Sequence, residues 1–151
     1  MARTHRPEFF ELLPTEAIEL LKQQHIGRLA YAFHDRVGIE PISYVYSDGW
    51  VYGRTSPGTK LTAMMHHPWV AFEVDEIESR FDWRCVVVHG ALYRLQADGG
   101  DRDRETYSHA VQLLREFDAA VLTAADSTPE REVLFRIHAD EITARAARST
   151  S

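Results

Sequence analysis

Apolar and polar residues alternate along most of the chain with the two-residue period of β-strands. The alternating runs are rich in branched and aromatic residues and are separated by turn residues, of which Asp48-Gly49 is the strongest hairpin signal. We expect strands over 28–33, 39–46, 50–54, 69–74, 83–95 and 132–139. Three other stretches predict helices, over 13–21, 60–66 and 102–117. Hairpin-linked strands with few helices favour a mainly β, antiparallel barrel or sandwich, preceded by a flexible arm at residues 1–10.

Two prolines and a glycine refine this pattern. Pro41 lies inside a predicted strand, which indicates a sheet edge or a break in pairing because proline cannot donate to the ladder. Pro68 ends the preceding helix, since the residue before a proline disfavours the α conformation. Gly90 lies within the longest predicted strand and indicates a bend there.

The composition is that of one ordinary globular domain. The chain has 151 residues, of which 44% are hydrophobic, so we expect a single domain over 1–151 with one core. No apolar run approaches the roughly 18 residues of a membrane helix, and residues 1–8 contain no apolar signal region. The single cysteine, Cys85, excludes an internal disulfide and fits a reducing, cytoplasmic location. The net charge of −6 argues against a nucleic-acid partner.

The segment RTSPGTK (54–60) concentrates chemistry between a predicted strand and a predicted helix. It contains two cations, three hydroxyls and a glycine just before the helix begins. The free N–H groups and positive dipole end of a helix can hold phosphate, while Arg and Lys neutralise its charge. The glycine spacing of a Walker loop is absent. On these residues alone the segment is either a phosphate site or a solvated turn with a helix cap, and both interpretations stay open.

Other distinctive segments accompany this loop in a fixed order. The loop RTSPGTKL (54–61) is followed by HPWVAFEVD (67–75). The remaining segments are GRLA (27–30), PISYVY (41–46), WRCVVVHG (83–90) and FRI (135–137). Together, over roughly residues 10–145, they resemble the pyridoxamine 5′-phosphate oxidase-like superfamily, in particular its small single-domain flavin-binding members related to nitroimidazole reductases. The resemblance implies a split β-barrel that binds FMN and forms a homodimer, with two FMN sites between the subunits.

The resemblance also implies roles for individual residues. Those expected at the FMN phosphate are Arg54, Thr55, Ser56, Thr59 and Lys60. Those expected along the edge of the flavin ring, largely through backbone groups, are Pro41, Ile42, Ser43 and Tyr44. Those expected near the ring are Glu73, Val74, Trp83, Arg84 and Cys85. Of these, the segment with Trp83, Arg84 and Cys85 often approaches the flavin from the partner subunit. Relatives commonly carry serine where this chain has Cys85, and a thiol is a weaker hydrogen-bond donor than a hydroxyl.

The implied function is that of an FMN-dependent oxidoreductase acting on a small organic substrate, with NAD(P)H as a candidate electron donor. Two alternatives stay open: a non-catalytic flavin-binding or storage protein, and a protein of the same fold that uses haem or the deazaflavin F420. The histidines that offer haem ligands, none of them singled out, are His66, His67, His89 and His138. Because His66 and His67 are adjacent rather than four residues apart, the sequence indicates no metal site. It identifies no catalytic residue.

Overall fold

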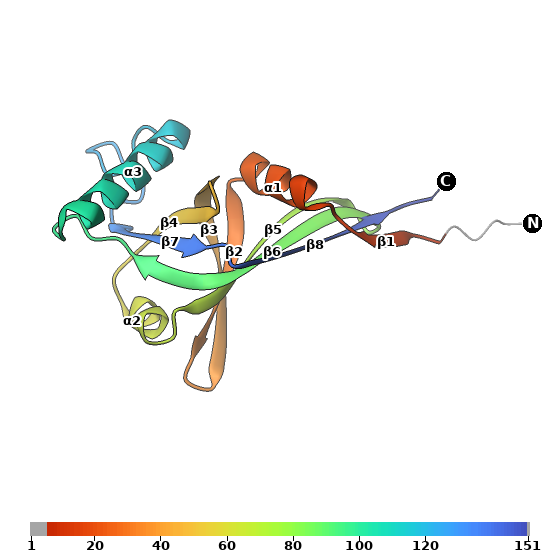
Figure 1. Cartoon of the computed structure of the whole chain (residues 1–151), viewed down its shortest axis with the longest axis horizontal. Helices are drawn as coiled ribbons and strands as arrows, with labels where there is room; N and C mark the ends of the chain where they lie inside the picture. The colour runs from red at the N-terminus through yellow and green to blue at the C-terminus, as the bar shows by residue number, and fades with distance from the viewer. Residues whose placement is uncertain (1–5, 151) are drawn as a thin grey trace, which may run out of the picture.

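The computed structural model describes residues 6–150, which form a β-barrel with three helices on its outside (Figure 1). The strands are β1 (Glu8–Glu11), β2 (Ile26–Phe33), β3 (Arg36–Ser47), β4 (Trp50–Thr55), β5 (Trp69–Ser79), β6 (Asp82–Arg94), β7 (Val133–His138) and β8 (Glu141–Arg148). The helices are α1 (Pro14–Gln23), α2 (Thr59–His66) and α3 (Asp101–Phe117). The three predicted helices are therefore confirmed with small shifts at their ends. No helix of the described residues is both long and apolar enough to cross a membrane.

The strands pair antiparallel in the order β1-β8-β6-β5-β2-β3-β4-β7, and the sheet closes because β6 also pairs with β7. Strand β6 changes partner along its length: it pairs with β8 as far as His89 and with β7 from Leu92 onward. Gly90 lies at this change, where a Cβ atom would stand 1.6 Å from the carbonyl oxygen of His138. The architecture is an antiparallel split β-barrel, as the family resemblance implies, and of the barrel and sandwich that the pattern favours it is the barrel.

The barrel interior is the main hydrophobic core. Its fully buried side chains include Leu29, Phe72 and Val88, and the rings of Tyr44 and Phe72 meet edge to face with centroids 5.0 Å apart. A second apolar cluster joins α3 to the outside of β4 and β7 through Tyr52, Leu114 and Leu134. Helix α3 therefore covers only part of the outer surface of the barrel (Figure 1).

The two ends of the described chain differ from the prediction. Residues 8–10, expected in a flexible arm, form β1 together with Glu11, and a strand that the pattern misses, β8, follows β7. The two strands pair with each other, Phe10 opposite Ala146. The buried positions of β8 are alanines, such as Ala144 and Ala146, which carry little strand signal of their own. Residues 1–5 of the expected arm lie outside the described residues.

Strand β5 continues five residues beyond its predicted end at Val74. Its acidic extension is held by pairing with β6, where Glu76 lies opposite Arg84. The guanidinium of Arg84 donates to Oε1 of Glu76 at 3.0 Å. A cross-strand ion pair thus keeps an acidic segment in extended conformation.

Candidate functional site

The start of α2 has no side-chain cap. The helix begins at Thr59, and its N-cap, Gly58, has no side chain to cap the first-turn N–H groups. Gly58 has φ +153°, a conformation that L side chains rarely adopt, and a Cβ atom there would meet nothing within 4 Å. Ser56 is half-buried before it, and Thr59 is exposed after it. The loop therefore offers uncapped backbone N–H donors at the positive end of a helix.

Lys60 is the cation of this loop that stays accessible. Its ammonium group forms an ion pair with Glu40 of β3, and both side chains remain a little over one quarter exposed. A partly exposed ion pair contributes little stability, so it does not lock Lys60 away from a ligand. Glu40 is nevertheless a negative charge beside the position where a phosphate would bind.

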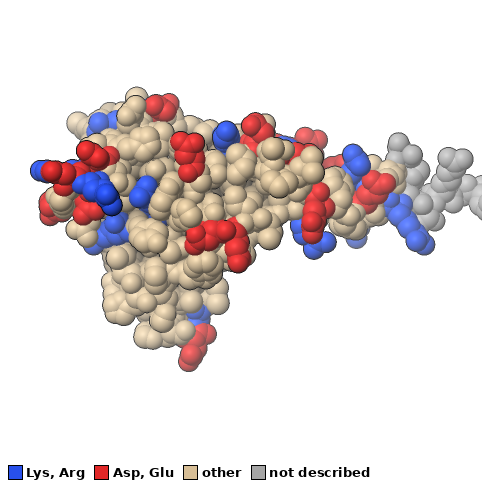
Figure 2. Space-filling view, in the orientation of Figure 1, with Lys and Arg blue, Asp and Glu red and all other residues tan. Residues whose placement is uncertain are grey.

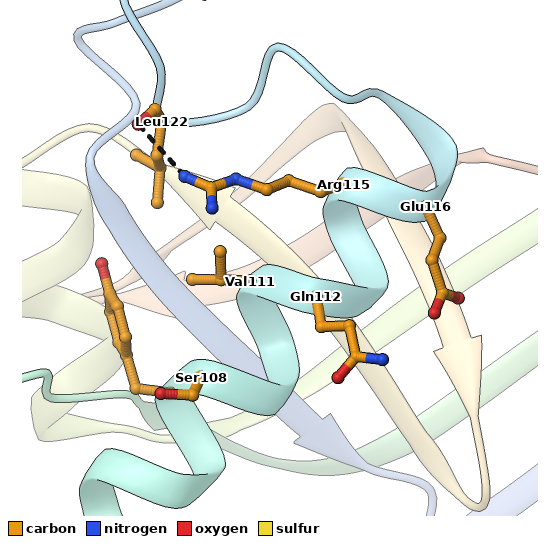
Figure 3. A pocket seen from close by; sticks show the side chains of 7 residues that line it. Ser108, Val111, Gln112, Arg115, Glu116 and Leu122 are labelled. Atoms are coloured by element: carbon orange, nitrogen blue, oxygen red, sulfur yellow. Dashed lines mark hydrogen bonds between the residues drawn. The ribbon is translucent and has the colours of Figure 1, made fainter.

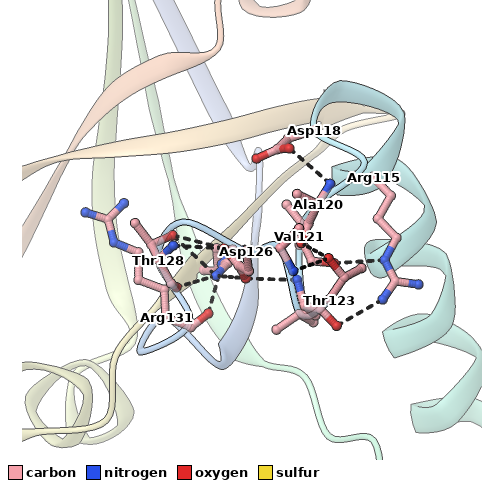
Figure 4. Close-up of polar contacts among 11 residues, drawn as sticks. Arg115, Asp118, Ala120, Val121, Thr123, Asp126, Thr128 and Arg131 are labelled. Atoms are coloured by element: carbon pink, nitrogen blue, oxygen red, sulfur yellow. Dashed lines mark hydrogen bonds and ion pairs between the residues drawn. The ribbon is translucent and has the colours of Figure 1, made fainter.

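Arg54, the other predicted phosphate ligand, is engaged in a buried network (Figure 4). Its Nη2 donates to Asp126 Oδ2 at 2.7 Å and to the Thr128 carbonyl at 2.6 Å, and its Nε donates to the Arg131 carbonyl at 2.8 Å. Hydrogen bonds from the Thr128 and Leu122 backbone and from Arg54 lower the pKa of Asp126 to about 2. Arg54 is only 8% exposed. In this structure the Arg54 side chain holds residues 126–131 against the end of β4 through these hydrogen bonds.

The predicted ring-edge residues alternate between the core and the outside. Ile42 and Tyr44 point into the barrel, and the Tyr44 hydroxyl donates to the Leu21 carbonyl at 2.7 Å, while burial raises its pKa. Pro41 and Ser43 face outward. Strand β3 pairs with β4 only from Tyr44 onward, so the preceding residues have a strand partner on one side alone. Pro41 itself stays paired with Arg28, so of the two alternatives predicted there the structure shows the sheet edge and no break in pairing.

Glu73 and Cys85 lie on the outer face of the sheet, beside a shared cation. Arg28 donates to Glu73 Oε1 at 3.2 Å and to Asp75 Oδ2 at 3.0 Å, and the Cys85 thiol donates to Glu73 Oε2 at 3.3 Å. Burial, followed by the contact with Asp75, raises the pKa of Glu73. Burial and the Glu73 carboxylate raise the pKa of Cys85 to about 12. Val74 points into the core, where it is fully buried.

Trp83 and Arg84 lie at the opposite end of the same strands. Trp83 pairs with Ile77, eight residues along β5 from Trp69, where the chain leaves α2. At about 3.3 Å per residue this separates Trp83 from the α2 end of the sheet by about 26 Å. In Figure 1 α2 lies at the lower left, and the β5–β6 turn lies at the other end of these strands, near β1 and β8. The structure thus brings Lys60 to the open edge of β3 through Glu40, whereas Trp83 and Arg84 lie on β6, three strands from that edge.

Several residues at the site have no distinctive sequence signal. Glu40, Asp126 and Arg131 stand in no motif, and Asp126 is 72 residues from its partner Arg54. Phe117 looks like an ordinary end of an amphipathic helix, yet its ring stacks on His25 with centroids 4.0 Å apart. Only the folded chain brings these groups to the outer face of β3 and β4.

A wider groove runs along α3 away from this site (Figure 3). Its walls include Tyr107, Val111 and Leu122, and Arg115 crosses it to donate to the Val121 carbonyl at 2.9 Å. Ser108, Gln112 and Glu116 line its exposed side. These side chains provide no cluster of groups suited to phosphate or redox chemistry, so we place the candidate site at the β3 edge and the α2 loop.

A split β-barrel with a hydroxyl-rich, cationic loop at the start of a helix defines the class of this protein. The family model for pyridoxamine 5′-phosphate oxidase matches residues 14–146. The chain belongs to the pyridoxamine 5′-phosphate oxidase family. It is also 30% identical over 129 residues to an uncharacterized protein of Rhizobium meliloti, covering 81% of this chain and 84% of that one.

Solved structures share the fold over nearly the whole chain. An FAD-binding protein of Mesorhizobium loti is 27% identical with a TM-score of 0.74, covering 95% of this chain and 99% of that chain. A protein of Bacteroides thetaiotaomicron, provisionally described as a 5-nitroimidazole antibiotic resistance protein, has a TM-score of 0.72 at 11% identity. The match covers 98% of this chain and 95% of that chain. At that identity the second likeness concerns the fold alone.

Proposed function

We propose that this protein binds FMN and acts as a flavin-dependent oxidoreductase on a small organic substrate, with NAD(P)H as electron donor. The observation that carries the proposal is the uncapped start of α2 beside Lys60, next to the open backbone edge of β3. The first feature suits a phosphate dianion, and the second suits the polar edge of a flat ring. The flavin, when bound, supplies the redox chemistry, and the chain binds and orients it. The likeness to an FAD-binding protein of Mesorhizobium loti supports a flavin as the cofactor.

We further propose that two copies of the chain complete the site. Trp83 and Arg84 lie on β6, three strands from the β3 edge that Lys60 contacts, so we assign them to the loop of the partner and not to their own. A surface with few charged side chains near α2 and the β2–β3 hairpin offers a place for the second copy (Figure 2). Val37 there is 79% exposed and Trp69 is 53% exposed. Large exposed apolar side chains on a surface with few charges are typical of a protein interface.

The test compares FMN with riboflavin, which has the same ring but no phosphate. Lys60→Ala should weaken FMN binding about tenfold or more and leave riboflavin binding nearly unchanged, because a charge-assisted contact is lost only with the phosphate. Glu40→Gln should tighten FMN binding a few-fold, since it removes the carboxylate that competes for Lys60. Both affinities are measured by quenching of flavin fluorescence.

Glu105→Gln serves as the matched control, because Glu105 is exposed on α3, which contributes none of the residues assigned to FMN. Equal losses for both ligands in Lys60→Ala would place the phosphate elsewhere. The visible spectrum of the purified protein separates the alternatives: flavin bands support the proposal, whereas a Soret band would favour haem. A colourless protein that takes up no added FMN contradicts the proposal. A flavin-loaded protein that NAD(P)H does not reduce would instead favour a storage role.

A further inference from the structure

A small cavity opens on the outer face of β3 and β4, between the candidate flavin site and α3. Its volume is about 170 Å³, and its walls come from β3, β4, the end of α3 and residues 121–131. Ser43 belongs both to this cavity and to the open edge of β3. A ligand in the cavity would therefore lie directly beside a flavin bound along that edge. The inference developed here rests on the proposed flavin function.

The Arg54 network determines which charge faces the cavity. Arg54 holds the carbonyls of Thr128 and Arg131 and the carboxylate of Asp126, so its own charge is neutralised. The guanidinium of Arg131 has no hydrogen-bond or ion-pair partner within residues 6–150. In Figure 4 this guanidinium points away from the Arg54 network. Arg54 is therefore a positioning residue that presents Arg131, a cation able to bind an oxyanion bidentately.

Asp118 also lines the cavity, and its charge must be accounted for. Its Oδ1 accepts the backbone N–H of Ala120 at 3.1 Å, which holds the carboxylate at the end of α3. Figure 4 places Asp118 on a different side of the network from the Arg131 guanidinium. An anionic group is thus expected at Arg131 and away from Asp118.

The remaining walls suit one flat ring. Phe117 lines the cavity, and His25 stacks on one face of its ring at 4.0 Å, which fixes the orientation of the ring. Ser127 and Thr128 add hydroxyls. A cavity of about 150 Å³ holds a benzene ring, so 170 Å³ accommodates one six-membered ring with a small substituent. A purine with its ribose is considerably larger.

We propose that this cavity binds a monocyclic aromatic anion, such as a ring carrying a carboxylate, with the anionic group on Arg131 and the ring beside Phe117. Molecules of this class are the proposed substrates, bound in the cavity next to the flavin. The specificity-determining residue is Arg131, which approaches the site from the segment after α3.

The test uses two probes of nearly equal shape, 4-nitrobenzoate and its neutral counterpart 4-nitrobenzamide. Each is titrated by calorimetry into the FMN-saturated protein. The wild type should bind the carboxylate about tenfold more tightly than the amide, because a charge-assisted hydrogen bond is lost with the amide. Arg131→Gln should abolish that preference, and Arg131→Lys should keep most of it. Arg104→Gln, on the exposed face of α3, is the charge-matched control and should leave the preference unchanged.

The outcomes separate this proposal from the proposed function. Equal affinity for the two probes, or a preference that survives in Arg131→Gln, would overturn the assignment of the cavity. The FMN and FAD affinities of Arg131→Gln are measured alongside. If that variant loses FAD affinity but keeps both FMN affinity and the carboxylate preference, the cavity serves a dinucleotide instead. A failure to bind any flavin is read from the visible spectrum and contradicts the proposed function, not the preference of the cavity.

Discussion

At the scale of single residues, the outer face of the sheet shows how neighbouring charges control a thiol. Cys85 donates to Glu73, and Glu73 shares Arg28 with Asp75. Two carboxylates thus surround one guanidinium, and the half-buried thiol beside them faces a net negative environment. Under these conditions Cys85 stays protonated at neutral pH and is a poor nucleophile. We therefore assign it a hydrogen-bonding role and no covalent chemistry.

The raised pKa of Cys85 determines how its reactivity and its contribution to stability change with pH. Its pKa in the folded protein is about 12, above the roughly 8.5 of a free thiol, so its contribution to stability is present below pH 8.5 and is lost as pH rises toward 12. The rate of alkylation by iodoacetamide, followed by mass spectrometry, should keep rising beyond pH 10. Glu73→Gln should lower the apparent pKa from this profile, and Glu78→Gln should not. A wild-type rate that levels off near pH 8 to 9 would show that the carboxylate does not act on the thiol.

At the scale of elements, β6 is the strand that closes the barrel, because it pairs with three other strands. It pairs with β5 over nearly its whole length, with β8 in its first part and with β7 in its last three residues. The change of partner requires the backbone around Gly90 to approach the His138 carbonyl closely. Glycine is needed there because the contact leaves no room for a side chain, while its backbone dihedrals lie in the ordinary range for L residues.

Gly90→Ala is therefore expected to destabilise the fold by about 3 kcal/mol, since the obstruction is backbone and cannot move aside cheaply. Urea unfolding followed by circular dichroism measures this cost. Gly100→Ala is the matched control: a Cβ atom there meets nothing within 4 Å, and the cost should stay below about 1 kcal/mol. Similar midpoints for the two variants would mean that β6 relaxes at the crossing more easily than the structure indicates.

At the scale of the whole molecule, the candidate site is divided between two distant regions. Lys60 and the β3 edge that it contacts lie together, whereas Trp83 lies three strands away on β6, beside the β5–β6 turn (Figure 1). In a two-fold symmetric dimer every contact between the chains occurs twice. If Trp83 of one chain lies at the Lys60 loop of its partner, the partner's Trp83 lies at the Lys60 loop of the first chain. The proposed dimer therefore predicts two equivalent flavin sites, each built from both chains.

Complementation between two defective chains tests this arrangement. Lys60→Ala and Trp83→Ala should each lower FMN binding alone. When the two are unfolded together and refolded as a mixture, half of the dimers should be mixed, and each of these carries one intact site. FMN titration should then recover about a quarter of the wild-type sites at high affinity. No recovery in a mixture that elutes as a dimer would place both residues at a site within one chain.

The sequence by itself determined those features of this protein that depend on neighbouring residues. Alternation, turn residues and helix ends locate most strands, the three helices and the loop 54–60, because burial on one face and backbone preference act over a few positions. Only the tertiary structure decided which distant groups meet. It formed β1 and β8 from segments without a strong pattern, engaged Arg54 with Asp126, exposed Arg131 to a cavity and separated Trp83 from Lys60. These outcomes depend on packing and charge pairing across the whole chain, which no local pattern records.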